Sequence, residues 1–221
     1  MRTLRHAAAH RPAAGSAPAI SRQQQRTAAT RAKLLAAAQF IFARDGFEAS
    51  RLEDIAARAG FTRGAFYANF DSKEDLLFAL MARVITEKVD SIRALLDRCE
   101  SPDERLQALR EYYASLAGDR SWVLLLLEFK LFALRHPQAR ARLVERYRKL
   151  RAPGRELLES LVRNLSRTLP ISSNATTIAL GALSNALLIE SLLDPKALKP
   201  DEIQFLLGMF FDALIGKPAR L

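Results

Sequence analysis

Apolar residues recur at the spacing of an α-helix along most of the chain. In residues 27–45 they follow an i, i+3, i+4 pattern that ends at Gly46, and a glycine in that position is typical of a helix C-terminus. From Asp71 to Leu96 the pattern continues for about seven turns, which predicts one long helix. The alternating pattern of a half-buried strand does not occur in the sequence. We therefore expect an all-α protein.

Proline and glycine stops divide the rest of the chain into further helices. We expect these helices at residues 102–117, 120–135, 137–167 with a break or kink at Pro153, 172–193 and 200–215. The pattern predicts a three-helix head joined by a long fourth helix to a larger helical body. Residues 1–25 contain almost no large apolar side chains and favour a disordered basic arm. We expect the arm at 1–26, the head at 27–87 and the body at 88–221.

Residues 50–76 are typical of two short helices joined by a tight turn. Ser50 and Glu53 have the spacing of a capping box, which predicts a helix that begins near Arg51. Gly60 stands where this helix must end and reverse, a position that favours left-handed backbone angles. Thr62 is expected to cap the second helix, which runs to about residue 70, and Asp71 is expected to cap the long helix. The second helix would direct one guanidinium and several hydrogen-bonding groups outward, as a DNA-contacting surface does.

Three stretches of this region together resemble a known family: TRAKLLAAAQFIFARDGFEAS, LEDIAARAGFTRGAFYANF and DSKEDLLFAL. They are similar to the DNA-binding domain of the TetR family of bacterial transcriptional regulators, over about sixty residues. The resemblance implies a helix-turn-helix that binds a double-stranded DNA operator. It implies DNA contacts at Ser50, Arg51, Thr62, Arg63, Gly64, Tyr67, Asn69 and Lys73.

Within that set, Arg63 is the expected base-reading residue, because its guanidinium can bond the O6 and N7 atoms of a guanine. By resemblance, Tyr67 and Lys73 contact phosphates. Asn69 occupies a position where many relatives have histidine, so a phosphate contact is the hypothesis there. Tyr67 can also pack its ring against the core of the head. The formal charge of +10, with eight Arg or Lys and no acidic residue before Asp45, would attract phosphates to this end of the chain.

The resemblance also implies a homodimer whose body binds a small-molecule effector. The sequence supports dimerisation independently, because residues 172–193 and 200–215 are apolar around more than one face. The alternative is that both helices are internal to a monomer. A dimer predicts a palindromic operator. The expected dimer interface comprises Ile178, Gly181, Ala182, Leu187, Phe205, Phe210, Phe211 and Leu214.

Aromatic and polar residues in the body are candidates for lining an effector cavity, although ordinary core packing would also explain them. The candidates are Tyr112, Trp122, Glu128, Phe129 and Phe132. Residues 135–155 carry eight basic side chains against one acidic residue, Glu145. This run is either a solvated helix face or a path for an anionic ligand such as an acyl thioester.

The sequence favours a ligand-responsive repressor over other functions. A transcriptional activator of the same fold and a DNA-binding protein without an effector remain alternatives. An enzyme is not expected, because the sequence has no nucleophile and base at a credible spacing, no phosphate loop and no metal-ligand cluster. His6 and His10 are assigned to the arm rather than to a metal, and no cofactor is expected.

The compartment is predicted from two features of the sequence. A single cysteine, Cys99, suits a reducing compartment. The uninterrupted apolar runs, such as residues 122–127, are too short to cross a bilayer. We therefore expect a cytoplasmic protein without a membrane partner.

Overall fold

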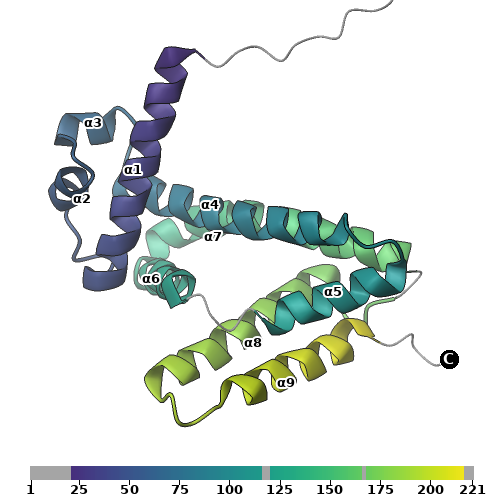
Figure 1. The fold of residues 1–221 in the computed structure, drawn as a ribbon. Coiled ribbons are helices and arrows are strands. Elements are labelled where there is room, and N and C mark those ends of the chain that lie inside the picture. The colour runs from purple at the N-terminus through teal and green to yellow at the C-terminus, as the bar shows by residue number, and fades with distance from the viewer. Residues whose placement is uncertain (1–20, 116–119, 166–167, 217–221) are drawn as a thin grey trace, which may run out of the picture.

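The computed structural model describes residues 21–115, 120–165 and 168–216, and every regular element in these ranges is helical (Figure 1). The all-α prediction is confirmed for this part of the chain. The elements are α1 (Arg22–Asp45), α2 (Leu52–Arg58), α3 (Arg63–Tyr67), α4 (Lys73–Leu96), α5 (Pro102–Ala114), α6 (Arg120–Arg135), α7 (Pro137–Asn164), α8 (Ser173–Leu193), α9 (Pro200–Phe211) and a π-helical turn, η1 (Asp212–Gly216).

Local chemistry fixes most of the ends of the helices in the head, which comprises α1, α2, α3 and the first turns of α4. Gly46 and Gly60 have φ angles of 82° and 78°, as expected of glycines at helix ends. The Thr62 hydroxyl accepts a hydrogen bond from the Ala65 amide and caps α3, as predicted. The predicted start of α4 is wrong by one residue, because Ser72 rather than Asp71 is the N-cap.

Two further sequence predictions about helix starts are wrong. The Ser50–Glu53 capping box does not form, because the Ser50 hydroxyl is buried and donates to the Phe47 carbonyl. The first helix begins at Arg22 rather than near residue 27, because Ser21 and Gln24 form a capping box that the sequence analysis missed. Residues 22–26 are therefore helical and not part of a disordered arm. Residues 1–20 lie outside the described residues.

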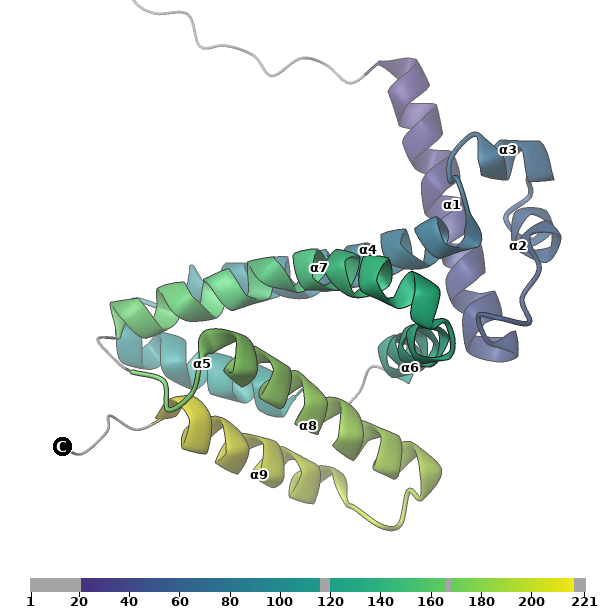
Figure 2. The same cartoon turned by 180° about the vertical axis from the view of Figure 1, so that it is seen from behind.

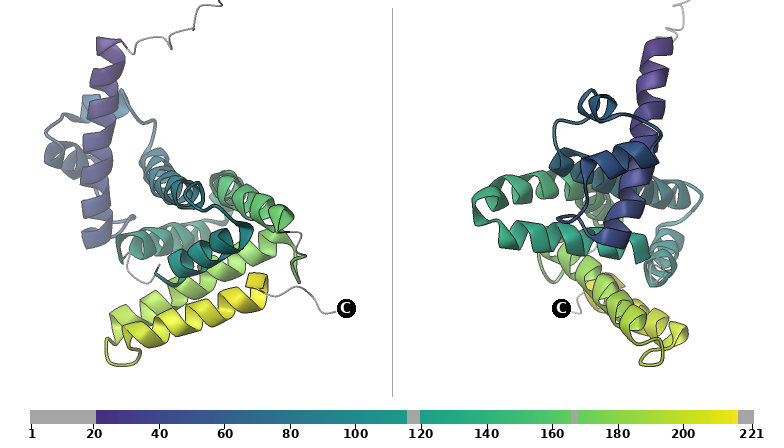
Figure 3. Two further views of the ribbon diagram at one scale, coloured as in Figure 1. Left: turned by 45° about the vertical axis from the view of Figure 1, so that its right-hand side comes forward. Right: turned by 90° about the vertical axis from the view of Figure 1, so that its left-hand side faces the viewer.

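Helices α4 and α7 form the long axis of the molecule and lie side by side (Figures 1 and 2). The predicted break at Pro153 is absent, since α7 continues from Pro137 to Asn164 with the proline inside it. Helix α6 lies beneath the head, while α8 and α9 form an antiparallel hairpin on the other side of the body (Figure 3). This arrangement holds the head at one end of the long axis.

The described residues form two separate hydrophobic cores. The head-side core combines α1, α2, α3 and the first half of α4 with residues of α6 and with Leu143 of α7. The distal core joins Tyr113 of α5 to residues of α7 and α9. Because α6 shares the core of the head, the packing boundary does not follow the predicted division at residue 87.

Helix α8 is long and apolar enough to pass for a membrane span by length and composition, and it alone does so among the described helices. Thr, Ser, Asn and Gly residues interrupt its apolar runs, so it contains no long uninterrupted apolar stretch. Only 17% of the tested window is buried inside the chain. A helix that packs on its own chain with one face and on a second copy with another has the same composition.

Candidate DNA interface and effector cavities

The turn between α2 and α3 presents one exposed polar surface. The positive φ of Gly60 reverses the chain, and its amide donates to the Ala57 carbonyl at 3.0 Å, which ends α2. Phe66 is fully buried and anchors α3 to the head-side core. Five of the predicted DNA contacts are exposed on this surface: Arg51, Thr62, Arg63, Gly64 and Tyr67. We call these five residues the DNA-facing surface.

Arg63 is held by two neighbours on this surface. Its guanidinium forms an ion pair with Glu53 of α2 at 2.7 Å and lies 3.4 Å from the Tyr67 hydroxyl. The Tyr67 hydroxyl, and after it the Glu53 carboxylate, raise the pKa of Arg63 above its usual value, so the group is charged. The Tyr67 ring packs edge to face on Phe66, with 5.4 Å between ring centroids. Tyr67 therefore combines core packing with an exposed hydroxyl, and Arg63 is positioned before any DNA arrives.

Ser50 and Lys73 hold the loop between α1 and α2, and the DNA contacts expected of them stay predictions. The Lys73 ammonium donates to the carbonyls of Glu48 and Ser50, both at 3.0 Å, and lies 4.8 Å from the centre of the Phe47 ring. Burial lowers the pKa of Lys73 below its usual value. Together the two residues fix the loop that leads into α2, so their role is to position the DNA-facing surface.

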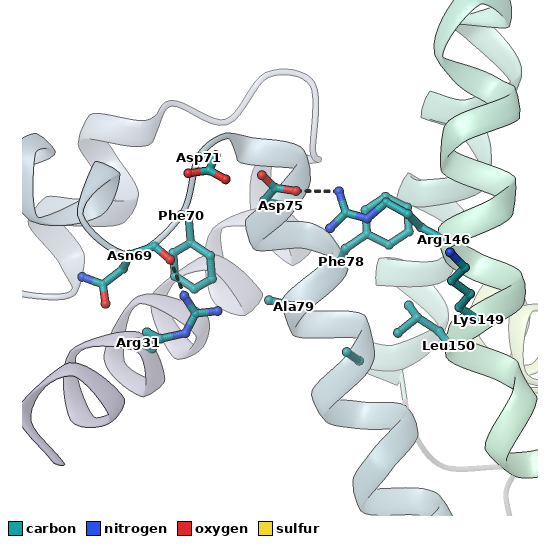
Figure 4. Close-up of a pocket in the computed structure, with 11 residues that line it drawn as sticks. Arg31, Asn69, Phe70, Asp71, Asp75, Phe78, Ala79, Arg146, Lys149 and Leu150 are labelled. Atoms are coloured by element: carbon teal, nitrogen blue, oxygen red, sulfur yellow. Dashed lines mark hydrogen bonds and ion pairs between the residues drawn. The ribbon is translucent and has the colours of Figure 1, made fainter. Parts of the chain in front are cut away.

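Asn69 lies at the edge of a cleft between the head and α7, with its backbone carbonyl toward Arg31 and its side chain pointing away from α7 (Figure 4). Its side-chain amide donates to the Ala65 carbonyl at 2.8 Å, and its backbone carbonyl accepts from Arg31 of α1. The guanidinium of Arg31 stacks on Phe70 at 4.1 Å. The side chain of Asn69 therefore serves the C-terminal end of its own helix, and its phosphate contact stays a prediction.

The opposite wall of this cleft is α7, which is linked to the first turn of α4 by an ion pair (Figure 4). Arg146 donates to Asp75 at 2.5 Å, and its guanidinium stacks on the ring of Phe78 at 4.1 Å. The contact between Arg146 and Asp75 could not be predicted from the sequence, because neither spacing nor a motif relates residues 71 positions apart. A change in the position of α7 would act directly on the start of α4.

Three of the predicted cavity residues instead join α6 to the head. The Glu128 carboxylate accepts a hydrogen bond from the Phe47 amide at 2.6 Å. Phe132 packs edge to face on Phe47 at 4.8 Å, and Phe129 packs on Phe78 at 5.4 Å. The prediction that Glu128, Phe129 and Phe132 line a ligand cavity is therefore wrong. Their aromatic and acidic character serves the junction between α6 and the loop that leads into α2.

The body contains an apolar hollow of about 210 Å³ between the end of α4, α5, α7 and α8, which we call the distal hollow. Tyr112, one of the predicted cavity residues, lines it, and burial raises the pKa of its hydroxyl. The hydroxyl of Tyr113 donates to the Leu180 carbonyl at 2.8 Å. The hollow is lined by Ile92, Leu96, Leu109, Tyr112, Tyr113, Gly154, Leu157, Leu158, Leu161, Thr177, Leu180, Gly181, Ser184, Phe211 and Ile215.

A second hollow of about 320 Å³ lies closer to the head, and we call it the basic hollow. Trp122 and Lys130 of α6, Lys88 of α4 and Arg151 of α7 contribute to its wall. Trp122 thus lines a cavity as predicted from the sequence. Neither hollow resembles a metal site, and among the described residues no three His, Cys, Asp or Glu side chains come together.

The predicted dimer residues divide into exposed and internal groups. Ile178, Ala182 and Phe205 are exposed, and Phe205 is 71% exposed although it is a large aromatic side chain. Phe211 is 1% exposed inside the distal core, so its assignment to a dimer interface is wrong. Gly181 lines both hollows, and the exposed Ile178 and Ala182 also line the basic hollow. The other three, Leu187, Phe210 and Leu214, are partly buried.

The small helical head has a polar helix-turn-helix surface, and the helical body has internal hollows. This combination is typical of DNA-binding regulators that carry a DNA-binding domain and a ligand-binding domain in one polypeptide. Comparison with known proteins agrees with this class. Residues 34–80 match the family described as bacterial regulatory proteins, tetR family. Residues 102–216, more than half of the chain, match the C-terminal family described as BetI-type transcriptional repressor. The chain belongs to the TetR family of transcriptional regulators.

Individual curated relatives match only part of the chain. The HTH-type transcriptional activator FasR of Mycolicibacterium smegmatis is 32% identical over 83 residues, which cover 38% of each protein. The chain spans 38% of the length of FasR and 40% of that of the repressor KstR2 of Mycobacterium tuberculosis.

Two solved structures share the fold. FadR from Bacillus subtilis, in complex with stearoyl-CoA, has a TM-score of 0.60 at 17% identity and covers 84% of this chain and 98% of its own. A regulator from Saccharomonospora viridis, in complex with choline, has a TM-score of 0.65 at 21% identity and covers 84% and 96%. At these identities the likeness concerns the fold alone.

Proposed function

We propose that the protein is a ligand-responsive repressor that binds a palindromic operator as a homodimer and releases it when a small molecule occupies the body. The observation that carries the DNA-binding part is the DNA-facing surface, where Arg63 projects from the first turn of α3 between Glu53 and Tyr67. Residues at the N-terminal end of a recognition helix are those that reach base edges in the major groove. The C-terminal family description favours repression.

The homodimer rests on apolar surface that the single chain leaves uncovered. Helix α8 exposes Ile178, Ala182 and Ala186 at intervals of four residues, which is one face of the helix. Helix α9 exposes Phe205 and Met209 in the same spacing. Large apolar groups on regular helix faces are typical of an interface with a second copy, and small alanines allow close helix approach. Two recognition helices would then meet two half-sites related by the same two-fold axis.

Coupling between effector and DNA is proposed to run through α6. One face of this helix lines the basic hollow with Trp122 and Lys130, while Glu128 and Phe132 on another face hold Phe47 of the head. Phe47 belongs to the loop that Lys73 also holds and that leads into α2. A ligand that displaces α6 would therefore reorient the DNA-facing surface. Thermodynamic reciprocity requires that the operator weaken effector binding by the same factor.

The test begins with selection of a binding sequence from a random DNA library by the full chain, followed by footprinting and affinity measurement. We expect protection of one short palindrome by two chains. Arg63→Ala should weaken binding by about 1–3 kcal/mol, on the order of tenfold to a hundredfold, because a bidentate guanine contact is lost. The control is Arg93→Ala, which removes the same charge from an exposed position on α4 remote from the DNA-facing surface.

Three results would count against the proposal. These are unchanged affinity of Arg63→Ala, diffuse protection instead of a palindrome, and affinity that is insensitive to salt despite the expected phosphate contacts. An activator of the same fold is the second candidate, since FasR is named as one. Transcription in vitro from a promoter that carries the selected operator, with the operator placed before or across the polymerase site, distinguishes activation from repression.

A further inference from the structure

The two hollows of the body share one wall. Thr177, Gly181 and Ser184 of α8 line both the distal hollow and the basic hollow. Their spacing of four and three residues places them on one face of the helix. On both α4 and α7 the basic hollow is lined by earlier turns of the helix than the distal hollow, for example Tyr147 against Leu158 on α7. The hollows are therefore neighbours along a common floor.

Gly181 leaves the boundary between the hollows open. A Cβ atom at this position would meet no heavy atom within 4 Å. A glycine in the middle of a helix is unfavourable relative to alanine, so the position gains nothing locally from lacking a side chain. Opposite this floor, Gly154 of α7 also lines the distal hollow, and a Cβ there would lie 4.0 Å from a methyl group of Val89. At these two positions the walls of the distal hollow carry no side chain.

Charge is confined to one of the hollows. Among the residues that the structure describes, the lining of the distal hollow contains no charged side chain, whereas that of the basic hollow has Lys88, Lys130 and Arg151 and no acidic one. Arg151 also lines an adjoining groove of about 470 Å³, together with Arg148 and Arg155. Those two arginines face Glu145 at 3.6 Å and Glu159 at 3.7 Å.

Arg151 differs from its two neighbours because no acidic group within the described ranges lies at ion-pair distance from it. Its Nε atom is buried and has no hydrogen-bond partner in the same part of the chain. Its guanidinium lies 4.8 Å from the centre of the Tyr147 ring. A partly desolvated guanidinium with a buried, unpaired N–H is stabilised when an anion pairs with it. Arg151 lies at the junction of the hollow and the groove, where a ligand that brings a negative charge could reach it.

We propose that the effector is an amphipathic anion, with its apolar chain in the distal hollow and its carboxylate or phosphate group paired with Arg151. This inference rests on the proposed function and names the chemical class of its ligand. The apolar chain of the effector would pass over Gly181 from one hollow to the other. A cationic effector is disfavoured, because its charge would lie beside Lys130 and Arg151. The stearoyl-CoA and choline complexes share this fold, so the distinction comes from the residues of this chain.

Direct titration of the full-length protein with small probes tests the class of ligand. The probes are decanoate, decyl phosphate, 1-decanol, decyltrimethylammonium, acetate and inorganic phosphate, followed by calorimetry below micelle-forming concentrations. We expect the two decyl anions to bind and 1-decanol to bind at least about tenfold more weakly, as expected for loss of one charged hydrogen bond. Acetate and phosphate alone should not bind measurably. The probe with the higher affinity, decanoate or decyl phosphate, then identifies the preferred headgroup.

Variants separate the roles of the charge and of the passage. Arg151→Gln should weaken binding of the decyl anions about tenfold and leave the affinity for 1-decanol unchanged. A merely structural role of Arg151 would not produce this difference. The matched control is Lys149→Gln, two residues away on α7, which loses the same charge but lines the cleft with the head. Gly181→Leu should abolish binding of every decyl probe while the thermal midpoint stays unchanged or rises, since the added side chain enters open space.

The inference is overturned if 1-decanol or decyltrimethylammonium binds as tightly as the anions, or if Lys149→Gln weakens the anions as much as Arg151→Gln. Failure of the proposed function gives a different result. In that case the protein protects no palindrome with or without a probe. Anion binding that fails to release the selected operator would likewise contradict the repressor mechanism and leave the class of ligand supported.

Discussion

The head-side core and the distal core come from the same helical pattern, yet they are filled differently. The head-side core packs aromatic rings such as Phe42, Phe47 and Phe66, each at most 2% exposed, among leucines from four helices. The distal core borders a hollow of about 210 Å³ where Gly154 and Gly181 take the place of larger side chains. Dense packing gives the DNA-facing surface one defined shape, whereas incomplete packing leaves the body able to accept a ligand.

Helix α6 connects these two regions in an unexpected way. Its apolar side completes the head-side core through Leu125, Leu126 and Phe129, although it belongs to the body by sequence. At the same time Trp122 and Lys130 face the basic hollow. Helix α6 is therefore shared by both regions: it packs in the head-side core and lines a hollow of the body.

The largest expected effect compares the same substitution in the two cores. Leu77 of α4 is fully buried in the head-side core, while Leu158 of α7 is 7% exposed and lines the distal hollow. Leu77→Ala should lower the free energy of unfolding by about 3–5 kcal/mol, and Leu158→Ala by about 2 kcal/mol, because a side chain beside a void loses fewer contacts. Denaturant titration at one fixed protein concentration measures both. Equal losses would show that the two cores are equally well packed.

A smaller effect is expected at the junction of α6 with the head. Glu128→Ala removes the acceptor of the Phe47 amide and should cost about 1.5–3 kcal/mol of unfolding free energy. It should also reduce the release of operator DNA by a bound effector. The control, Glu87→Ala, removes an exposed carboxylate of α4 that lies 3.8 Å from Arg83, and it should change stability by less than about 0.5 kcal/mol. Normal effector response in Glu128→Ala would exclude this junction as the coupling route.

The smallest effect concerns alkaline pH and the distal core. Burial raises the pKa of Tyr112 and Tyr113 above their ordinary value of 10.0. Above that pH the unfolded chain loses these protons while the folded chain keeps them, so stability present at neutral pH falls as the pH rises. Tyr113→Phe should lose about 1 kcal/mol at neutral pH with its bond to Leu180, and its stability should then fall less steeply toward about pH 11. Parallel curves for the two proteins would contradict the assignment.

Capping shows how far the sequence could predict the local structure. Thr62 caps α3 and Gly60 reverses the chain as predicted, because each depends on residues within one turn. Ser50 and Asp71 have the same local chemistry and were expected to cap, but Ser50 is buried under its own loop and Ser72 caps α4 instead. The angle at which the chain enters each helix decides between such neighbours, and distant packing sets that angle.

The sequence by itself determined the helices, the helix-turn-helix and its exposed Arg63 and Tyr67, because periodicity and short-range hydrogen bonds act within a few residues. Only the tertiary structure decided what Lys73, Glu128 and Arg151 do. Lys73 and Glu128 bind backbone groups of the loop after α1, and Arg151 meets a hollow formed with α4, α6 and α8. A charged side chain is assigned its role by the groups that surround it after folding, and those groups lie far away in the chain.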